Sequence, residues 1–284
     1  MAAPHDAPLR ALIFDVDGTL AETERDGHRV AFNRAFAELG LDWYWDEATY
    51  GRLLEVTGGK ERMLHHWRGL DPAAAQAPGA AALVAELHRR KTRHYVELVD
   101  AGTVALRPGV RRLLRQAREA GLRLAIATTT TPDNVQALLR AALGEAAEGL
   151  FDCIGAGDIV PRKKPDPGIY LWVLEQLGLP PAQCLAFEDS PAGLRAAQGA
   201  GLRTVVTPGV YTAGETFGQA WALLDSLGEP EQPARGRVAG RAWSGVADPR
   251  ALRDWVARDV LTRGAVAGQE AARREAARRE AARP

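Results

Sequence analysis

The chain has 284 residues, of which 46% are hydrophobic and 25% are charged, and this composition excludes disorder over most of its length. Lysine plus arginine equals aspartate plus glutamate at 36 each, so net charge provides no general attraction to nucleic acid or to an acidic membrane. No apolar run reaches the roughly 18 residues of a membrane span, and the N-terminus lacks the pattern of a secretory signal, so we expect a cytoplasmic protein.

Short apolar runs along the chain predict strands that are buried on both faces. They are Leu9–Phe14, Leu122–Ala127, Phe151–Ile154, Cys184–Phe187 and Thr204–Val206. Helical patterns lie between them, at Gly109–Ala120, Asp133–Leu143, Pro167–Leu177 and Ala192–Ala200. Alternating strands and helices are typical of a parallel sheet covered by helices, so we predict an α/β fold with a Rossmann-like core.

The long interval between the first and second predicted strands breaks this alternation. Its segments His28–Leu39, Glu61–Trp67 and Ala80–Val99 have apolar residues at a spacing near 3.6, which indicates helices. We therefore predict a helical cap domain at residues 23–103, inserted into a core that is formed by residues 8–22 and 104–228. A cap that leaves directly after the first strand would cover the edge of the sheet where open α/β folds bind ligands.

The character of the sequence changes near Gly228. Residues 229–247 are rich in proline, glycine and arginine and predict a linker. Residues 248–284 predict a helical, low-complexity tail that ends in repeats of Glu-Ala-Ala-Arg-Arg, with favourable glutamate–arginine pairs four residues apart. The repeats have no apolar face, which favours a solvated helix; the alternative is a contact segment for an acidic protein partner.

The strongest signal for chemistry is Asp15-Val16-Asp17-Gly18-Thr19, which follows the first predicted strand directly. Two carboxylates at positions i and i+2 of an extended chain point the same way. Like charges this close are costly unless a cation lies beside them, so the motif favours a divalent metal site. Taken alone, the motif also fits a polar strand end that begins a turn.

Three further polar motifs come at or just beyond the ends of later predicted strands. Thr128 offers a hydroxyl beside the N–H groups of a helix start, which together could hold phosphate; threonine also caps helices. Lys164, in Lys163-Lys164-Pro165, could neutralise phosphate charge or lie on the surface. Glu188-Asp189 could bind a metal ion or precede the next helix as its cap.

In this order the four motifs resemble the haloacid dehalogenase superfamily of phosphohydrolases over about residues 9–227, and the helical insert is similar to its C1-type cap. The resemblance implies that Asp15 is a nucleophile that forms an aspartyl-phosphate and that Asp17 is the general acid and base. It implies Mg²⁺ as the cofactor, held by Asp15, the backbone carbonyl of Asp17 and Asp189, with Glu188 bound directly or through water. The residues that it implies for phosphate binding are Thr128, Thr129 and Lys164.

Finer motifs resemble the CbbY-type proteins of carbon-fixing organisms: they are residues 20–33, residues 57–62, Thr128–Thr131 with Asn134, and Lys163-Lys164-Pro165. This resemblance implies hydrolysis of a small sugar phosphate, xylulose 1,5-bisphosphate, to xylulose 5-phosphate, which removes an inhibitor of rubisco. A bisphosphate needs a second anion site, for which we expect Lys60, one of four lysines in the chain, with Arg62 as a further candidate. The other substrate contacts that we expect are Glu22, His28, Gly59 and Asn134.

Other functions stay open. A phosphoglycolate-type or other small-metabolite phosphatase needs no second anion site. β-Phosphoglucomutase shares the fold and both catalytic aspartates, but its cap carries a Lys-Gly-x-Ser-Arg pattern where this chain has Val56-Thr57-Gly58-Gly59-Lys60. The alternative of another class is a non-catalytic binding protein that acts through its tail. For the preferred function we expect a monomer that takes a small-molecule sugar phosphate and no nucleic acid.

Overall fold

The computed structural model describes residues 8–259, and its centre is a sheet with the strand order β3-β2-β1-β4-β5-β6-β7-β8. Strands β1 to β6 run parallel to one another, whereas β7 is antiparallel to β6 and β8 is antiparallel to β7. The strands are β1 (Ala11–Phe14), β2 (Arg123–Ala127), β3 (Cys153–Gly155), β4 (Cys184–Glu188), β5 (Arg203–Val206), β6 (Ala222–Leu224), β7 (Ala234–Val238) and β8 (Arg241–Gly245). A parallel α/β core was predicted, and this fold class is confirmed.

Helices cover both faces of the sheet. They are α5 (Val110–Glu119) and α6 (Pro132–Leu143) on one face, and α7 (Gly168–Leu177) and α8 (Pro191–Gly199) on the other. Successive residues of β1 point to opposite faces of the sheet. Leu12 and Phe14 pack with α5 and α6, while Ala11 and Ile13 pack with α7 and α8. All four residues of β1 are buried, which is why the strand reads as an unbroken apolar run.

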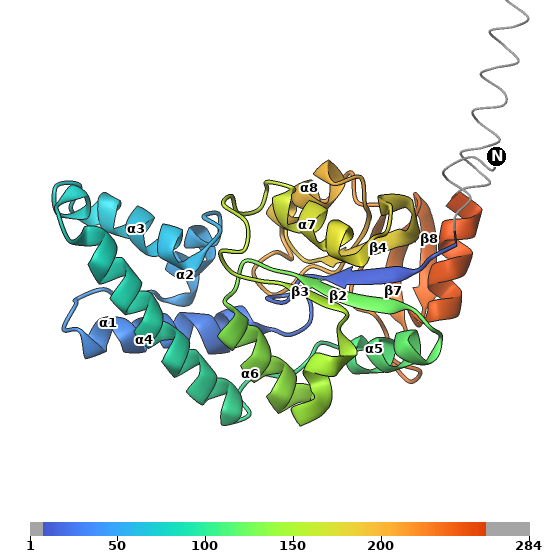
Figure 1. Ribbon diagram of the computed structural model, residues 1–284, viewed down its shortest axis with the longest axis horizontal. Coiled ribbons are helices and arrows are strands. Elements are labelled where there is room, and N and C mark those ends of the chain that lie inside the picture. Colours follow the sequence, from blue (N-terminus) through green and yellow to red (C-terminus); the bar gives the residue numbers. More distant parts are fainter. Residues whose placement is uncertain (1–7, 260–284) are drawn as a thin grey trace, which may run out of the picture.

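The helical cap lies beyond one end of the sheet, at the left of Figure 1. It consists of α1 (Arg29–Glu38), α2 (Glu47–Leu53), α3 (Gly59–Leu70) and α4 (Ala80–Asp100), with short helices η1 (Glu24–His28) and η2 (Ala74–Gln76). The core contributes two more short helices, η3 (Glu145–Leu150) and η4 (Pro181–Gln183). The cap has an aromatic core of its own, built around Phe32, Phe36 and Trp45. Among residues 8–259, none of the helices combines the length and the apolar composition that a membrane-spanning segment needs.

The chain enters and leaves the cap at neighbouring points. Ala21 on the way out pairs with Leu106 on the way back in an antiparallel bridge, and the N–H of Arg107 donates to the carbonyl of Leu20 at 2.9 Å. The cap is thus attached by two adjacent segments, which we call the first crossing (residues 20–22) and the second crossing (residues 106–108).

The prediction of a linker at residues 229–247 is wrong, because this segment forms the β7–β8 hairpin at the edge of the sheet. Ala234 and Val238 of β7 are buried, whereas Arg235 and Arg237 are exposed. The arginines thus occupy the outward positions of a half-buried strand rather than marking a solvated linker.

Residues 249–259 form a helix that packs on this hairpin. Its Trp255 ring lies 4.7 Å from the ring of Trp243 in β8 and 6.4 Å from that of Trp221, between ring centroids. Part of the predicted tail is therefore attached to the core. The Glu-Ala-Ala-Arg-Arg repeats, and the partner contact considered for them, lie outside the described residues.

Candidate active site

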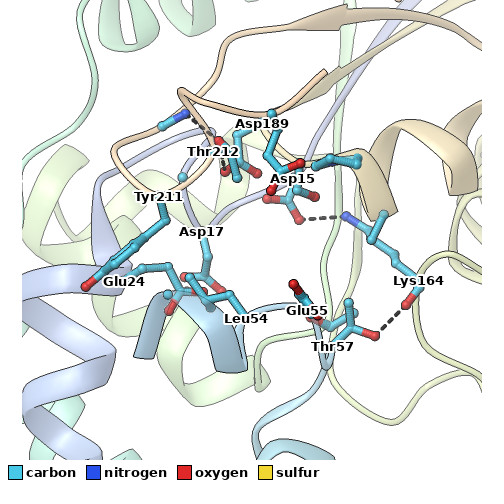
Figure 2. Close-up of a pocket in the computed structure, with 18 of the residues that line it drawn as sticks. Asp15, Asp17, Glu24, Leu54, Glu55, Thr57, Lys164, Asp189, Tyr211 and Thr212 are labelled. Atoms are coloured by element: carbon cyan, nitrogen blue, oxygen red, sulfur yellow. Dashed lines mark hydrogen bonds and ion pairs between the residues drawn. The ribbon is translucent and has the colours of Figure 1, made fainter. Parts of the chain in front are cut away.

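Four polar stretches meet at one edge of the sheet because they follow parallel strands. Asp15 comes directly after β1, Thr128 after β2, and Glu188 ends β4. The N–H of Asp15 donates to the carbonyl of Phe187 in β4 at 3.0 Å, so pairing of the two strands continues to the motif. Lys164 reaches the same place from the loop that follows β3 (Figure 2).

The ammonium of Lys164 lies at the centre of this arrangement. It is 4% exposed and donates to Asp15 Oδ1 at 2.6 Å, to Glu188 Oε1 at 2.7 Å and to the carbonyl of Ala127 at 2.8 Å. The hydroxyl of Tyr170 donates to the same Glu188 oxygen. Burial alone would lower the pKa of Lys164, but the carboxylates of Asp15 and Glu188 more than offset it and raise this pKa above its usual range. Lys164 is therefore a permanently charged group.

The carboxylates of Asp15, Glu188 and Asp189 form a cluster that suits a metal ion. Each offers an oxygen, and these oxygens all lie within 4.8 Å of one another. Burial raises the pKa of Asp15 to about 8 despite Lys164, and burial and nearby carboxylates raise that of Asp189. Glu188 Oε2 is buried without a hydrogen-bond partner. Buried oxygens that repel one another are the ligands of a hard divalent cation, so these residues fit such an ion.

Gly18 is required by the packing around this cluster. It has a φ of 84°, and a Cβ at this position would lie 2.2 Å from Asp189 Oδ2. A side chain would therefore collide with a carboxylate of the cluster, which explains the glycine of the Asp-x-Asp-Gly-Thr motif. The next helix is capped by Ser190, whose Oγ accepts from the N–H of Gly193 at 3.1 Å, so the cap is neither Glu188 nor Asp189.

Asp17 faces the cap instead of the carboxylate cluster. Its Oδ1 accepts from the Thr23 hydroxyl at 2.5 Å and lies 2.8 Å from His28 Nε2. Burial would raise the pKa of Asp17, but His28, Thr23 and Lys91 outweigh it and lower the pKa to about 2. The other ring nitrogen of His28 lies 2.8 Å from Lys91 Nζ, and both side chains are buried.

Sequence reasoning missed Lys91 and Thr23. A lysine on the buried face of a predicted cap helix, in a chain with four lysines, is a signal that could have pointed to Lys91. Thr23 carried no such signal, because its contact with Asp17 depends on the first crossing. His28, expected to meet substrate, has both ring nitrogens beside protein groups.

A cavity of about 480 Å³ lies between cap and core, a volume that suits a small metabolite. Asp15, Lys164 and Asp189 face it from the core, and Leu54, Glu55 and Thr57 face it from the cap (Figure 2). The Thr57 hydroxyl also donates to the backbone carbonyl of Lys164, which joins the two domains at the cavity wall. The loop after β5 contributes Gly209, Val210, Tyr211 and Thr212.

The expected site residues fall into two groups. Those that line this cavity are Asp15, Asp17, Glu22, Arg62, Thr129, Lys164 and Asp189. The others lie beside or behind it: Glu188, buried under Lys164; Thr128, which is 1% exposed; Asn134, whose amide donates to Thr130 Oγ1 at 3.0 Å; His28; Gly59; and Lys60.

Lys60 and Arg62, the two candidates for a second anion site, point in different directions. Lys60 faces a neighbouring cavity of about 420 Å³ and pairs with Asp158 Oδ2 at 2.6 Å. Arg62 is 7% exposed and lines the cavity that contains Asp15 and Asp189. Its Nε donates to the Leu53 carbonyl at 3.1 Å, and its NH1 donates to the Tyr50 hydroxyl at 3.1 Å.

Comparisons with known proteins agree on one family. A family model described as "Hydrolase: haloacid dehalogenase-like hydrolase" matches residues 9–201. The protein CbbY of Cupriavidus necator is 53% identical over 249 residues, which cover 87% of this chain and 96% of that protein. The CbbY of Rhodobacter capsulatus is 54% identical over 218 residues, which cover 76% of this chain and 93% of that protein.

Solved structures of CbbY from Rhodobacter sphaeroides are also similar. The complex with phosphate is 52% identical, with a TM-score of 0.71, and the match covers 77% of this chain and 94% of that one. A mutant of the same protein, in complex with xylulose 1,5-bisphosphate, is 51% identical with a TM-score of 0.71 and the same coverage.

Proposed function

The chain belongs to the haloacid dehalogenase-like hydrolase family as a CbbY-like sugar phosphate phosphatase, and we propose that its substrate is xylulose 1,5-bisphosphate. The observation that carries the proposal is one cavity lined by the carboxylates and Lys164 of the core and by the buried Arg62 of the cap. Such a cavity can take an anionic group on each side. The binding of xylulose 1,5-bisphosphate to a mutant of a 51% identical protein supports this choice of substrate. Its product would be xylulose 5-phosphate, and the reaction would remove an inhibitor of rubisco.

We assign Asp15 as the nucleophile and Asp17 as the acid and base. A carboxylate oxygen of Asp15 attacks phosphorus, the sugar oxygen leaves, and an aspartyl-phosphate forms; water then cleaves the acyl phosphate and releases inorganic phosphate. The lowered pKa of Asp17 keeps it ionised, which is the form that takes a proton from the attacking water. Donation to the leaving oxygen needs the protonated form, which is favoured when the negative phosphate approaches Asp17.

We propose Mg²⁺ as the cofactor, held by Asp15, Asp189 and the backbone carbonyl of Asp17, with Glu188 Oε2 bound directly or through water. When bound, the ion offsets the repulsion between an anionic nucleophile and an anionic phosphate. The positive charge of Lys164 also offsets this repulsion, since its ammonium lies 2.6 Å from Asp15 Oδ1. Thr129, which lines the cavity, and the N–H groups that follow Thr128 would hold the phosphoryl oxygens.

The experiment that tests this function is phosphate release from four substrates with added Mg²⁺: xylulose 1,5-bisphosphate, ribulose 1,5-bisphosphate, phosphoglycolate and β-glucose 1-phosphate. We expect the highest kcat/KM for xylulose 1,5-bisphosphate. A higher value for phosphoglycolate would replace our substrate by a monophosphate, and formation of glucose 6-phosphate without phosphate release would identify a mutase.

The second anion site can be tested with two cap variants. We assign it to Arg62 ahead of Lys60, because Arg62 shares the cavity with Asp15. Arg62→Lys should lower kcat/KM for the bisphosphate by about 10- to 100-fold, the size of a lost charged hydrogen bond, and leave phosphoglycolate turnover nearly unchanged. Lys60→Ala is the matched variant and should cost less. The reverse order would move the second anion site to Lys60.

A further inference from the structure

Arg107 joins the cap attachment to the cavity wall. It lies in the second crossing, and 9% of its side chain is exposed. NH1 donates to the backbone carbonyls of Gly18 and Thr207, the latter at 2.5 Å, and NH2 donates to the carbonyl of Pro208 at 2.7 Å. Nε lies 3.2 Å from Glu22 Oε1. One guanidinium therefore connects the catalytic loop, the first crossing and the loop that follows β5.

Each of these three segments carries cavity-lining residues. Gly18 lies against the Asp189 carboxylate, and Glu22 lines the cavity itself. The loop after β5 supplies Thr212, whose Oγ1 lies 3.4 Å from Asp189 Oδ2, and Tyr211, whose ring packs on helix α2 of the cap. A shift of this loop would therefore move two things together: the carboxylate of Asp189 and the cap side of the cavity.

The geometry of these contacts requires arginine. Three carbonyls and one carboxylate surround a single planar group with a fixed fork of donors, whereas a lysine has one nitrogen at the end of a flexible chain. The segments are loops with some backbone hydrogen bonds of their own: the N–H of Gly18 donates to the carbonyl of Ala21, and the N–H of Thr207 to that of Glu188, each at 2.8 Å. The guanidinium adds bonds to the carbonyl oxygens of Gly18, Thr207 and Pro208, so it couples the position of the first loop to that of the loop after β5.

We propose that Arg107 is a positioning residue for phosphate ester hydrolysis, holding Asp189 and the 207–212 loop in register with Asp15 across the two cap crossings. Arg107 contacts neither the reacting atoms nor the carboxylate cluster directly. It acts through Gly18, Glu22 and the loop after β5. The proposal rests on the phosphatase function and does not depend on which sugar phosphate is the substrate.

Arg112 provides a matched control for the test. Its side chain is 11% exposed, it donates to the backbone carbonyls of Leu227, Gly228 and Ala247, and it pairs with Glu229. It is thus a similar guanidinium clamp, but it holds the C-terminal segment and does not line the cavity. Loss of either arginine should lower the thermal midpoint, so stability alone does not distinguish them.

The experiment measures kcat, KM and the thermal midpoint of the wild type, Arg107→Lys, Arg107→Ala, Arg112→Lys and Arg112→Ala, with Mg²⁺ and p-nitrophenyl phosphate. We expect kcat to fall about 30- to 100-fold in the Arg107 variants, as for a misplaced catalytic group, and to change less than about threefold in the Arg112 variants. Millimolar guanidinium should restore part of the turnover of Arg107→Ala and none of the turnover lost in an Arg112 variant.

Two results would overturn the proposal: kcat of a folded Arg107→Lys within threefold of the wild type, or equal losses of kcat in the Arg107 and Arg112 pairs. The lysine variant keeps the charge and serves as the test if the alanine variant does not fold. Because p-nitrophenyl phosphate reports on the chemistry alone, a wild type that hydrolyses it but ignores xylulose 1,5-bisphosphate would contradict only the proposed substrate.

Discussion

Asp15 and Asp17 are two residues apart, yet their surroundings shift their pKa values in opposite directions. Burial among carboxylates raises the pKa of Asp15, whereas His28 and Thr23 lower that of Asp17. Two carboxylates in contrasting environments can take different roles in one reaction, and we propose those of nucleophile for Asp15 and of proton carrier for Asp17. The pair itself could be predicted from the sequence, because the motif is local. The partners of Asp17 could not, since Lys91 approaches through His28 from 63 residues further along the chain.

Asp15→Asn should abolish turnover because an amide does not attack phosphorus as a carboxylate does. We expect phosphate release to fall by about 10³-fold or more, with the far-ultraviolet circular dichroism spectrum unchanged. An Asp15→Asn protein that keeps a substantial rate after repeated purification would contradict the assignment of the nucleophile.

His88 should make the protein sensitive to acid. Burial first, and then Lys91 and Lys60, lower the pKa of His88 to about 3, so the side chain is neutral in the folded protein above that pH. In the unfolded chain its pKa returns to the usual 6.5, so unfolding at a pH below 6.5 is accompanied by protonation of His88. The unfolded chain therefore binds more protons between these two values, and the free energy of unfolding falls as the pH drops from 6.5 toward 3.

The measurement is urea unfolding of the wild type and His88→Gln at pH 7 and pH 5. The wild type should lose up to about 2 kcal/mol more than the variant between these conditions. Equal losses in both proteins would show that His88 does not carry the effect.

At the scale of elements, the sequence predicts best what is most deeply buried. The central strands and the helices that cover them were predicted because their apolar periodicity is strong on one face or both. Strand β7 was missed because its inward residues, Ala234 and Val238, are few and small, while exposed arginines dominate its composition. A strand with only one buried face gives a weak signal, although β7 pairs with a neighbour on each side, and the glycine and proline residues around it obscured that signal further.

The helix at residues 249–259 should therefore contribute to global stability. Trp255 is 6% exposed and packs against Trp243 and Trp221, so Trp255→Ala should lower the free energy of unfolding by about 3–5 kcal/mol. Arg250→Ala, an exposed position on the same helix, is the control and should cost less than about 0.5 kcal/mol. Urea unfolding compares them; similar values for both would mean that the helix is dispensable to the core.

At the scale of the whole molecule, the fold concentrates negative charge at one point while the chain as a whole is neutral. Equal numbers of acidic and basic residues leave no net charge, yet three buried carboxylates converge at the carboxyl edge of the sheet. This convergence was predictable from the order of motifs along parallel strands. The sequence did not predict that Arg62 rather than Lys60 faces the cavity. Both residues lie in the first turn of α3, and only the orientation of that helix decides which side chain points toward the cavity.

A divalent cation should stabilise the folded protein through this cluster. At about 100 times its Kd, Mg²⁺ should add about 2.7 kcal/mol. That corresponds to a rise of about 5–10 °C in the thermal midpoint for a chain of this size. Asp189→Asn should reduce the response, and EDTA should reverse it in the wild type. A midpoint that does not move with Mg²⁺, in protein freed of metal beforehand, would contradict the cofactor.

The bridge between Ala21 and Leu106 also bears on how such proteins diversify. A segment whose two ends lie side by side can be replaced by another of similar span without altering the connections of the sheet around it. Recombination between genes of this family at these two positions would exchange everything that the cap contributes to substrate choice in one step. Asp15, Asp17 and Lys164, to which we assign the chemistry, lie outside the exchanged segment and would be inherited intact, so new substrates could arise while the reaction stays the same.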